Sequence, residues 1–315
     1  MDTSLLELGG ADQERTFKAN DYKGPAARWC PGCGDFSILA TTRRLLEAEQ
    51  LAPEKTVFVS GIGCSSRFPH YLKTYGFHGI HGRALPISLG VKMRRPDLNV
   101  FVVMGDGDCA SIGAGHWIHA IRYNTNLTVL MLDNNIYGLT KKQTSPTTPQ
   151  GYVTNTQPQG SYLRPMDPIS VVLGMAGASF VAQTADWIPA HLLATMKAAQ
   201  AHKGLSFIRI LQRCPKFTPD IFDAKVKAPH EIEVLGHEFG INDPKVTKMY
   251  KNHREHNPHD IDAARALTGP SDLTRIGLFY HNPEQPIYDE LRRSQSFTAE
   301  EKLAELEKEF DKYAV

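Results

Sequence analysis

Two stretches of the chain decide the fold: VFVVMGDGD at residues 100–108 and LTVLMLDNNIYG at residues 127–138. Each begins with a nearly continuous apolar run, which is typical of a strand buried on both faces of a parallel sheet. The segment between them, 110–123, has the apolar spacing of a helix. A strand, a crossover helix and a second strand place both polar turns at the same edge of the sheet.

The same alternation continues on both sides of these stretches. Further strands are predicted at 56–59, 179–182 and 206–211, and further helices at 35–51, 85–93, 169–176 and 187–202. We therefore predict an α/β fold with a doubly wound, mainly parallel sheet. The predicted organisation is an N-terminal arm at 1–27, an α/β domain at 28–215 and an extended C-terminal region at 216–315.

The C-terminal region has no clear period until its last segment. There, Thr298 and Glu301 form a capping box, followed by Leu303, Leu306 and Phe310 at helical spacing. An amphipathic terminal helix is expected.

Composition excludes several classes of protein. The chain has 315 residues, 35 Lys and Arg against 34 Asp and Glu, and a net charge of +1, which argues against nucleic acid as a dominant partner. No apolar run approaches the roughly 18 residues of a membrane span. The acidic segment 1–15 lacks the apolar region of a signal peptide, so we expect a cytoplasmic protein. Five cysteines, an odd number, favour metal binding, redox chemistry or packing over disulfides.

The two strand-end motifs predict a cation and phosphate site. Asp106 and Asn134 would meet at one sheet edge, where a carboxylate and an amide oxygen suit Mg²⁺. The glycines let the backbone approach a diphosphate, and the following helix directs its N–H groups toward that anion. The competing interpretation is two ordinary tight turns. A Rossmann dinucleotide site is disfavoured because no G-x-G-x-x-G motif follows a strand.

Four of the cysteines point to one metal centre. Cys30 and Cys33 lie in WCPGC, and Cys64 and Cys214 follow the predicted strands 56–59 and 206–211 at the same sheet edge. The order Pro-Gly and the lack of a preceding strand oppose a thioredoxin-like site. Spacing alone does not distinguish a zinc site from a [4Fe–4S] cluster. Cys64 or Cys214, taken singly, could also be a small buried apolar residue. Cys109 is expected to pack in the core.

The joint pattern resembles the β subunits of the 2-oxoacid:ferredoxin oxidoreductases over residues 25–215. The motifs that carry the resemblance are WCPGCG at 29–34, SGIGC at 60–64, HGRA at 81–84 with Pro86, GDGD at 105–108 and NNIYGLTK at 134–141. GLFY at 277–280 with Asn282 and Pro283 is similar to the 2-oxoglutarate-type members.

The resemblance implies thiamine diphosphate, Mg²⁺ and one [4Fe–4S] cluster as cofactors. The implied Mg²⁺ ligands are the side chains of Asp106 and Asn134 and the carbonyl of Ile136, and the implied cluster ligands are Cys30, Cys33, Cys64 and Cys214. The implied cofactor-binding residues are Ile62, Gly63, Cys64, Ser65, His81, Gly82, Gly105, Gly107, Asp108, Gly138 and Leu139.

The implied reaction is the coenzyme A-dependent oxidative decarboxylation of a 2-oxoacid, with electrons passed through the cluster to ferredoxin. The favoured substrate is 2-oxoglutarate, converted reversibly to succinyl-CoA and CO₂; pyruvate and branched-chain 2-oxoacids are alternatives. No Glu lies near the motifs, and the resemblance implies that a partner α subunit supplies the glutamate that activates thiamine.

Three residues are predicted to take part in catalysis. His81 is expected at the thiamine pocket, and Arg67 and Lys141 are candidates for the distal carboxylate of a dicarboxylate substrate, although either could be a solvated surface charge. Two other classes of protein stay open at this point: an ordinary thiamine enzyme with zinc-binding or packing cysteines, and a non-catalytic iron–sulfur electron-transfer protein.

Overall fold

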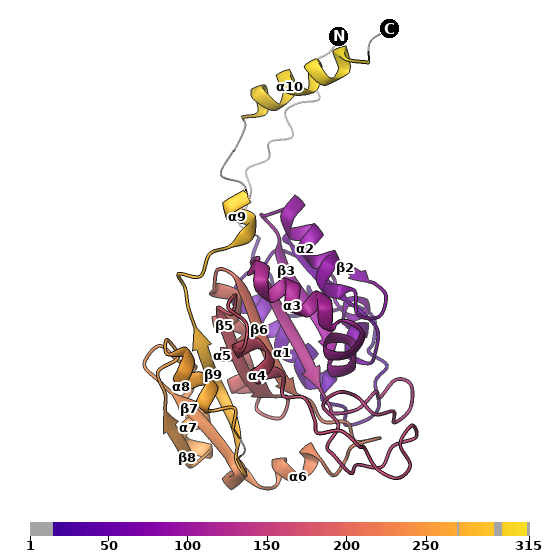
Figure 1. Ribbon diagram of the computed structural model, residues 1–315, viewed down its shortest axis with the longest axis vertical. Coiled ribbons are helices and arrows are strands. Elements are labelled where there is room, and N and C mark those ends of the chain that lie inside the picture. Colours follow the sequence, from indigo (N-terminus) through magenta and orange to yellow (C-terminus); the bar gives the residue numbers. More distant parts are fainter. Residues whose placement is uncertain (1–14, 270, 293–297, 314–315) are drawn as a thin grey trace.

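A nine-stranded sheet forms the centre of the molecule in the computed structural model, which describes residues 15–269, 271–292 and 298–313 (Figure 1). The strands are β1 (Thr56–Ser60), β2 (Tyr75–His78), β3 (Asn99–Gly105), β4 (Leu127–Asp133), β5 (Phe180–Ala185), β6 (Leu205–Leu211), β7 (Ile232–Gly236), β8 (Asn252–Glu255) and β9 (Thr274–His281). They lie in the order β2-β1-β3-β4-β6-β5-β9-β7-β8, and every neighbouring pair is parallel except β5 with β9. The predicted α/β fold with a mainly parallel sheet is confirmed.

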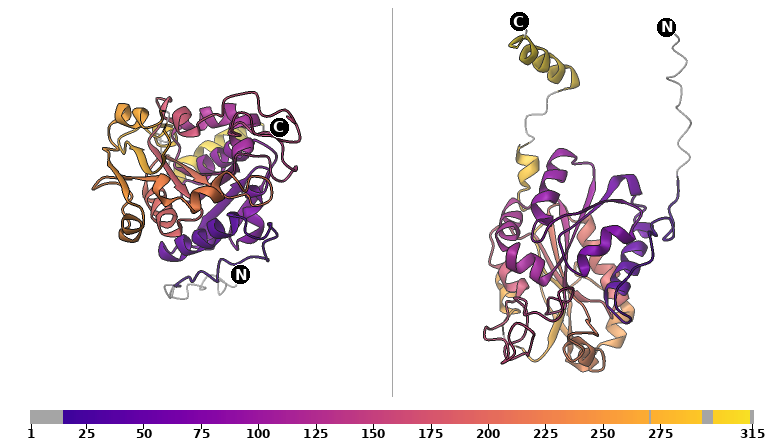
Figure 2. Two further views of the ribbon diagram at one scale, coloured as in Figure 1. Left: turned by 90° about the horizontal axis from the view of Figure 1, so that it is seen from below. Right: turned by 90° about the vertical axis from the view of Figure 1, so that its right-hand side faces the viewer.

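Helices cover both faces of this sheet, as the edge-on view in Figure 2 shows. One layer holds α2 (Ala84–Arg94), α3 (Ala114–Tyr123) and α4 (Pro168–Leu173), and the other holds α1 (Asp35–Ala48) and α5 (Pro189–Ala201). Successive residues of β3 alternate between the two layers: Val102 packs in the core of the first, and Phe101 and Val103 in the core of the second. The sheet is therefore doubly wound.

The helix predicted at 110–123 begins later than expected. A short π-helical segment, Asp108–Ile112, precedes α3. This segment begins at Asp108, a buried carboxylate that is tied to other loops, and π-helical turns recur at functional sites. At its other end α3 stops at Asn124, whose φ of 47° is the left-handed conformation that commonly terminates helices.

The region after residue 215 adds strands that the sequence pattern did not predict. Besides β7, β8 and β9 it contains α6 (Phe222–Val226), α7 (Pro244–Met249) and α8 (Ile261–Ala266). Strand β9 pairs antiparallel with β5, and its Ile276, Leu278 and Phe279 are buried. These strands were missed because apolar and charged residues mix within them; β8 reads Asn-His-Arg-Glu and is mostly exposed.

The predicted terminal helix is α10 (Ala299–Asp311), which follows α9 (Tyr288–Arg292). Its capping box is confirmed, because Glu301 N–H donates to Thr298 Oγ1 at 3.1 Å and Thr298 N–H donates to Glu301 Oε2 at 2.7 Å. Its apolar residues Leu303, Leu306 and Phe310 are exposed. No helix in the described ranges has both the length and the apolar character that crossing a membrane requires.

Part of the predicted N-terminal arm, residues 1–14, lies outside the described residues. The described part packs on the body of the molecule. Tyr22 is fully buried, and its hydroxyl lies 3.0 Å from the carbonyl oxygens of Leu46 and Leu51. The arm is thus anchored to α1 and the loop that follows it.

Candidate active site

The carboxyl ends of β1, β3, β4 and β6 meet at the lower edge of the sheet in Figure 1. The segments that leave these ends are 61–64, 105–108, 133–138 and 212–214. Parallel strands in this order bring loops from distant parts of the sequence to one edge, the usual ligand-binding position in open α/β sheets.

A cavity of about 160 Å³ lies at this edge and holds most of the residues predicted to bind the cofactor. It is lined by Ile62, Gly63, Cys64, Ser65, His81, Gly105, Asp106, Gly107, Asp108, Leu132, Asn134, Ile136, Tyr137, Gly138, Leu139 and Thr140. Of the residues predicted to bind the cofactor, Gly82 is not among those that line it. Four motifs that were found separately in the sequence, at 60–64, 81–84, 105–108 and 134–141, therefore share one space.

Asp108 holds three loops around this cavity. Its Oδ1 accepts hydrogen bonds from the N–H groups of Ile62 at 3.1 Å and Gly82 at 2.7 Å, and lies 2.6 Å from His81 Nδ1. Burial raises the pKa of Asp108, and these hydrogen bonds oppose the rise. Gly61 must be glycine, because a Cβ there would lie 2.1 Å from Asp108 Oδ2. Asp108 therefore fixes the walls of the cavity.

Gly82 and His81 lie on a loop that Asp108 orients. Gly82 is buried, has a φ of +73° and would bring a Cβ to 2.7 Å from Gly113 N, so it supports the cavity from behind. A carboxylate only accepts hydrogen bonds, so the proton of the His81 ring is assigned to Nδ1. The Nε2 atom of His81, whose side chain is 34% exposed, is left available to a ligand.

Asp106 and Asn134 lie in the same cavity, as the predicted cation site requires. Asn134 Oδ1 accepts a hydrogen bond from Ile136 N–H at 3.2 Å, which fixes the turn after β4. Burial, together with the nearby charge of Asp133, raises the pKa of Asp106 to about 7. This buried carboxyl has no cationic side chain within ion-pair distance in the described part of the chain.

Thr147 connects this carboxyl to a second one. Its Oγ1 lies 2.8 Å from Asp106 Oδ2 and 2.8 Å from Asp133 Oδ1. The Thr147 hydroxyl has one proton, so it can donate to only one of the two carboxyl groups at a time. A protonated Asp106 supplies a second proton, so that both short contacts can be hydrogen bonds. Asp133 has a cationic partner, because Arg209 NH2 and Nε lie 2.6 and 2.7 Å from its Oδ2.

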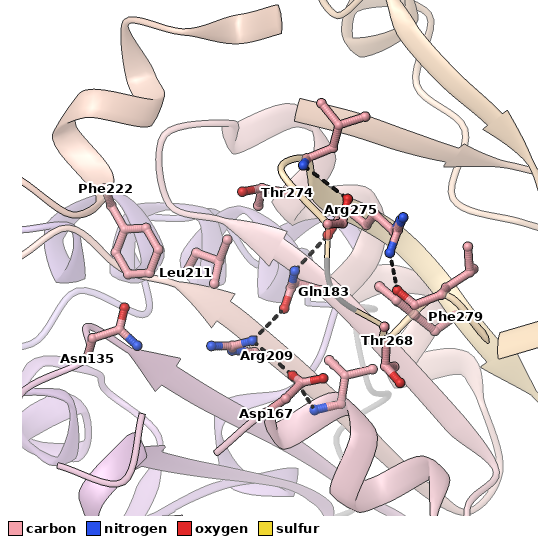
Figure 3. Close-up of a pocket in the computed structure, with 15 residues that line it drawn as sticks. Asn135, Asp167, Gln183, Arg209, Leu211, Phe222, Thr268, Thr274, Arg275 and Phe279 are labelled. Atoms are coloured by element: carbon pink, nitrogen blue, oxygen red, sulfur yellow. Dashed lines mark hydrogen bonds and ion pairs between the residues drawn. The ribbon is translucent and has the colours of Figure 1, made fainter. Parts of the chain in front are cut away.

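Figure 3 shows the polar cavity of about 230 Å³ into which Arg209 extends. The NH1 group of Arg209 lies 3.3 Å from Asp167 Oδ1 and 3.2 Å from Gln183 Oε1. Gln183 Nε2 in turn donates to the carbonyl of Arg275 on β9 at 2.7 Å. Hydrogen bonds and ion pairs thereby link Asp106 to the C-terminal strands.

The four cysteines predicted to bind a metal line a second cavity, of about 260 Å³. Its lining residues are Arg28, Trp29, Cys30, Cys33, Cys64, Arg67, Asn134, Gly138, Leu139, Lys141, Gln212, Cys214, Pro215, Lys216 and Phe217. Cys64, Asn134, Gly138 and Leu139 also line the first cavity. A Cβ at Gly138 would lie 3.7 Å from Cys64 Sγ and 3.9 Å from Cys214 Sγ. The two cavities therefore share a thin wall.

All five cysteines are free thiols. Burial raises the pKa of Cys33 and raises that of Cys64 to about 12, so neither thiol ionises readily by itself. Gln212 Nε2 donates to Cys33 Sγ at 3.3 Å. Cys109 is completely buried in the core with α2 and α3 and lines neither cavity.

Arg67 and Lys141 line the cysteine cavity rather than the cofactor cavity. Arg67 NH1 donates to the carbonyl of Arg28 at 2.9 Å. Lys141 has a φ of +72°, which is strained for a residue with a side chain. Both cations line the same cavity as Leu139 and Gly138, which also line the cofactor cavity.

Sequence reasoning missed Tyr137, Thr147 and Arg209. Tyr137 covers Gly107 and donates to its carbonyl at 3.1 Å; its place within NNIYG was the available signal. Thr147 lies in a Thr- and Pro-rich connection and Arg209 inside an apolar strand. Nothing in either local pattern marks a contact with the site.

Comparisons with known proteins agree with this geometry. Residues 61–210 match the family model "Thiamine pyrophosphate enzyme, C-terminal TPP binding domain". The chain is 43% identical over 298 residues to 2-oxoglutarate oxidoreductase subunit KorB of Mycobacterium tuberculosis, covering 86% of this chain and 79% of the relative. It is 36% identical over 277 residues to the 2-oxoacid:ferredoxin oxidoreductase subunit beta of Saccharolobus solfataricus, covering 85% of this chain and 87% of that one.

A solved structure is also similar. It is the 2-oxoglutarate:ferredoxin oxidoreductase of Magnetococcus marinus with 2-oxoglutarate, coenzyme A and succinyl-CoA bound, which aligns with a TM-score of 0.79 and 33% identity over 94% of this chain and 97% of that one. Together with the two curated relatives, this match shows that the chain belongs to the β subunits of the 2-oxoacid:ferredoxin oxidoreductases.

Proposed function

We propose that this chain is the β subunit of a 2-oxoglutarate:ferredoxin oxidoreductase. The enzyme would convert 2-oxoglutarate and coenzyme A reversibly to succinyl-CoA and CO₂, and two electrons would pass to ferredoxin. The observation that carries the proposal is the wall shared by the cofactor cavity and the four-cysteine cavity. The names of the M. tuberculosis relative and of the M. marinus structure favour 2-oxoglutarate over pyruvate.

Thiamine diphosphate with Mg²⁺ fits the first cavity. Asp106 and Asn134 supply the oxygen ligands that Mg²⁺ prefers, and the backbone carbonyl of Ile136 would be the third protein ligand. The pKa of Asp106 is raised because the carboxyl is buried near Asp133 without a cationic partner among the described residues, and a bound cation would stabilise its ionised form. Gly105 and Gly107 have no side chains to block a diphosphate. When bound, thiamine diphosphate supplies the electron sink for cleavage of the carbon–carbon bond.

A [4Fe–4S] cluster fits the second cavity better than zinc does. A zinc ion needs its sulfur ligands about 2.3 Å from one point. No three His, Cys, Asp or Glu side chains in the described ranges are gathered so closely. Cys30, Cys33, Cys64 and Cys214 instead surround a space of about 260 Å³, as the larger cluster requires. The cluster would accept electrons across the wall formed by Gly138.

His81 is the residue of this chain best placed to handle a proton in the cofactor cavity. Asp108 holds its Nδ1–H, which leaves Nε2 to accept a proton from, or donate one to, the bound substrate. No glutamate is among the described residues that line the cavity. The α subunit is therefore proposed to supply the carboxyl that activates the thiamine ring, and the β subunit alone should not decarboxylate.

Arg67 and Lys141 are proposed to bind the distal carboxylate of 2-oxoglutarate. Both line the cysteine cavity together with Gly138 and Leu139, two of the residues that it shares with the cofactor cavity. A substrate that reaches past Leu139 would bring its far end to these cations, and a charged hydrogen bond to a carboxylate is worth roughly 1.5–3 kcal/mol. Pyruvate has no second carboxylate to use them.

Anaerobic copurification with the α subunit tests the whole proposal. The complex should be brown, contain four irons for each β subunit, and reduce methyl viologen when 2-oxoglutarate, coenzyme A, thiamine diphosphate and Mg²⁺ are present. Cys214→Ser should remove most of the iron and the viologen activity. Cys109→Ala, the matched control, should keep both.

Two results would contradict the proposal. A colourless complex that contains zinc would support an ordinary thiamine enzyme instead. A brown protein whose melting temperature does not rise with thiamine diphosphate and Mg²⁺ would support an electron-transfer protein, since a ligand that binds the folded state must stabilise it.

A further inference from the structure

Four cationic side chains and no carboxylate are among the described residues that line the cysteine cavity. Arg28, Arg67, Lys141 and Lys216 all line it, and we call them the basic rim. None of the four forms an ion pair with any residue that the structure describes. The rim therefore presents a net positive field on a chain whose total charge is only +1.

The backbone holds two members of the basic rim in place. Arg67 NH1 donates to the carbonyl of Arg28 at 2.9 Å, which ties two of the cations together. Lys141 and Lys142 have φ values of +72° and +61°, and Asn155 stabilises this strained turn. Its Nδ2 donates to the Lys141 carbonyl at 2.6 Å, and its N–H donates to the Lys142 carbonyl at 2.8 Å. These hydrogen bonds hold the Arg67 guanidinium and the Lys141 backbone in place beside the cavity.

The rim encloses an exposed, partly apolar centre. Leu139 is 49% exposed there, and Cys30 is the exposed member of the four cysteines. The sulfur of Cys30 is thus the point at which a protein partner comes nearest to the proposed cluster. Arg28 and Lys216 are exposed and have no role in the proposed decarboxylation.

We propose that the basic rim is the docking surface for ferredoxin. The partner would be a small protein with an acidic face around its own iron–sulfur centre. The inference rests on the proposed function, because it needs the cluster in the cysteine cavity. A cluster held by Cys30, Cys33, Cys64 and Cys214 would be oxidised by one electron as the docked ferredoxin is reduced by one, with no bond made or broken. Attraction between opposite charges speeds the formation of such short-lived electron-transfer complexes, and this attraction weakens as salt is added.

The test is charge reversal in the αβ holoenzyme. Arg28→Glu with Lys216→Glu should raise the KM for an acidic two-cluster bacterial ferredoxin about 10- to 100-fold at low salt, because like charges now meet. In this variant, kcat/KM for ferredoxin should also decrease less steeply as ionic strength rises. Viologen reduction and the KM values for 2-oxoglutarate and coenzyme A should not change. The matched control, Lys245→Glu with Lys248→Glu on α7, alters net charge equally at exposed positions that do not line the cavity.

Three outcomes would overturn the inference. They are an unchanged KM for ferredoxin, an equal rise in the control pair, and a rise in the KM for coenzyme A, which would assign the cations to its phosphates. If the wild-type complex does not reduce viologen, the proposed function fails separately. Calorimetric titration of oxidised ferredoxin into the complex then tests the rim without turnover, and wild-type affinity in the Arg28 and Lys216 variant would refute it.

Discussion

Replacing Thr147 by Val should weaken Mg²⁺ binding without unfolding the protein. Thr147 Oγ1 lies 2.8 Å from both Asp106 Oδ2 and Asp133 Oδ1, and the residue is 2% exposed. Val fills nearly the same volume but cannot donate to the ionised Asp106 that Mg²⁺ requires. A hydrogen bond to a charged group is worth roughly 1.5–3 kcal/mol, so Mg²⁺ should bind about 10- to 100-fold more weakly.

The stability cost should be smaller. Asp133 keeps Arg209 and the N–H groups of Asn135 as partners, and Asp106 can stay protonated when Mg²⁺ is absent. We expect urea unfolding in EDTA to show a loss of about 1–2 kcal/mol.

The assay is calorimetric titration of Mg²⁺ into the holoenzyme loaded with thiamine diphosphate. Thr147→Ser, which keeps the hydroxyl, is the control and should bind within about threefold of wild type. Wild-type affinity in the Val variant, or equal weakening in the Ser and Val variants, would refute the idea that the Thr147 hydroxyl supports Asp106.

Three other predictions test separate parts of the molecule. Arg67→Ala should raise the KM for 2-oxoglutarate much more than that for pyruvate in steady-state assays; equal effects would remove Arg67 from substrate recognition. Burial lowers the pKa of His191 to about 4, so the unfolded state takes up its proton first, and the free energy of unfolding should fall by up to about 3 kcal/mol from pH 6.5 to pH 4. His191→Gln should reduce that slope in urea titrations at several pH values, and an unaltered slope would contradict the assignment. Gly107→Ala should cost about 1–3 kcal/mol, because its Cβ would lie 2.1 Å from the Tyr137 ring; Gly138→Ala, with no neighbouring atom nearer than 3.7 Å, is the control and should unfold at nearly the wild-type urea concentration.

The fold was predictable where one signal dominates. Runs such as 100–104 and 127–132 are buried on both faces, so each is almost wholly apolar and reads as a parallel strand. Strand β9 is equally buried at its centre. It begins with polar and charged residues and pairs antiparallel with β5, so its sequence does not have the pattern of a buried parallel strand. Local pattern reports whether a residue is buried, whereas pairing depends on a strand almost a hundred residues away.

The chemistry of the site followed from residue types at strand ends. Acidic, amide, glycine and cysteine residues after successive parallel strands must gather at one edge, because the sheet aligns those ends. That argument placed Asp106 near Asn134 and Cys64 near Cys214, and these residues line the two neighbouring cavities. Cys30 and Cys33 follow no strand in the described part of the chain, so the argument does not place them.

The sequence by itself therefore determined the α/β class, the edge that carries the site and the ligand types available there. Only the tertiary structure decided how these residues are divided between two cavities with a common wall, and that Thr147 joins Asp106 to Asp133. The physical reason is that short-range apolar patterning identifies which segments form buried strands and helices. A hydrogen bond from a long loop, or a cation that lines the cysteine cavity, instead depends on how segments far apart in the sequence are placed by the tertiary fold.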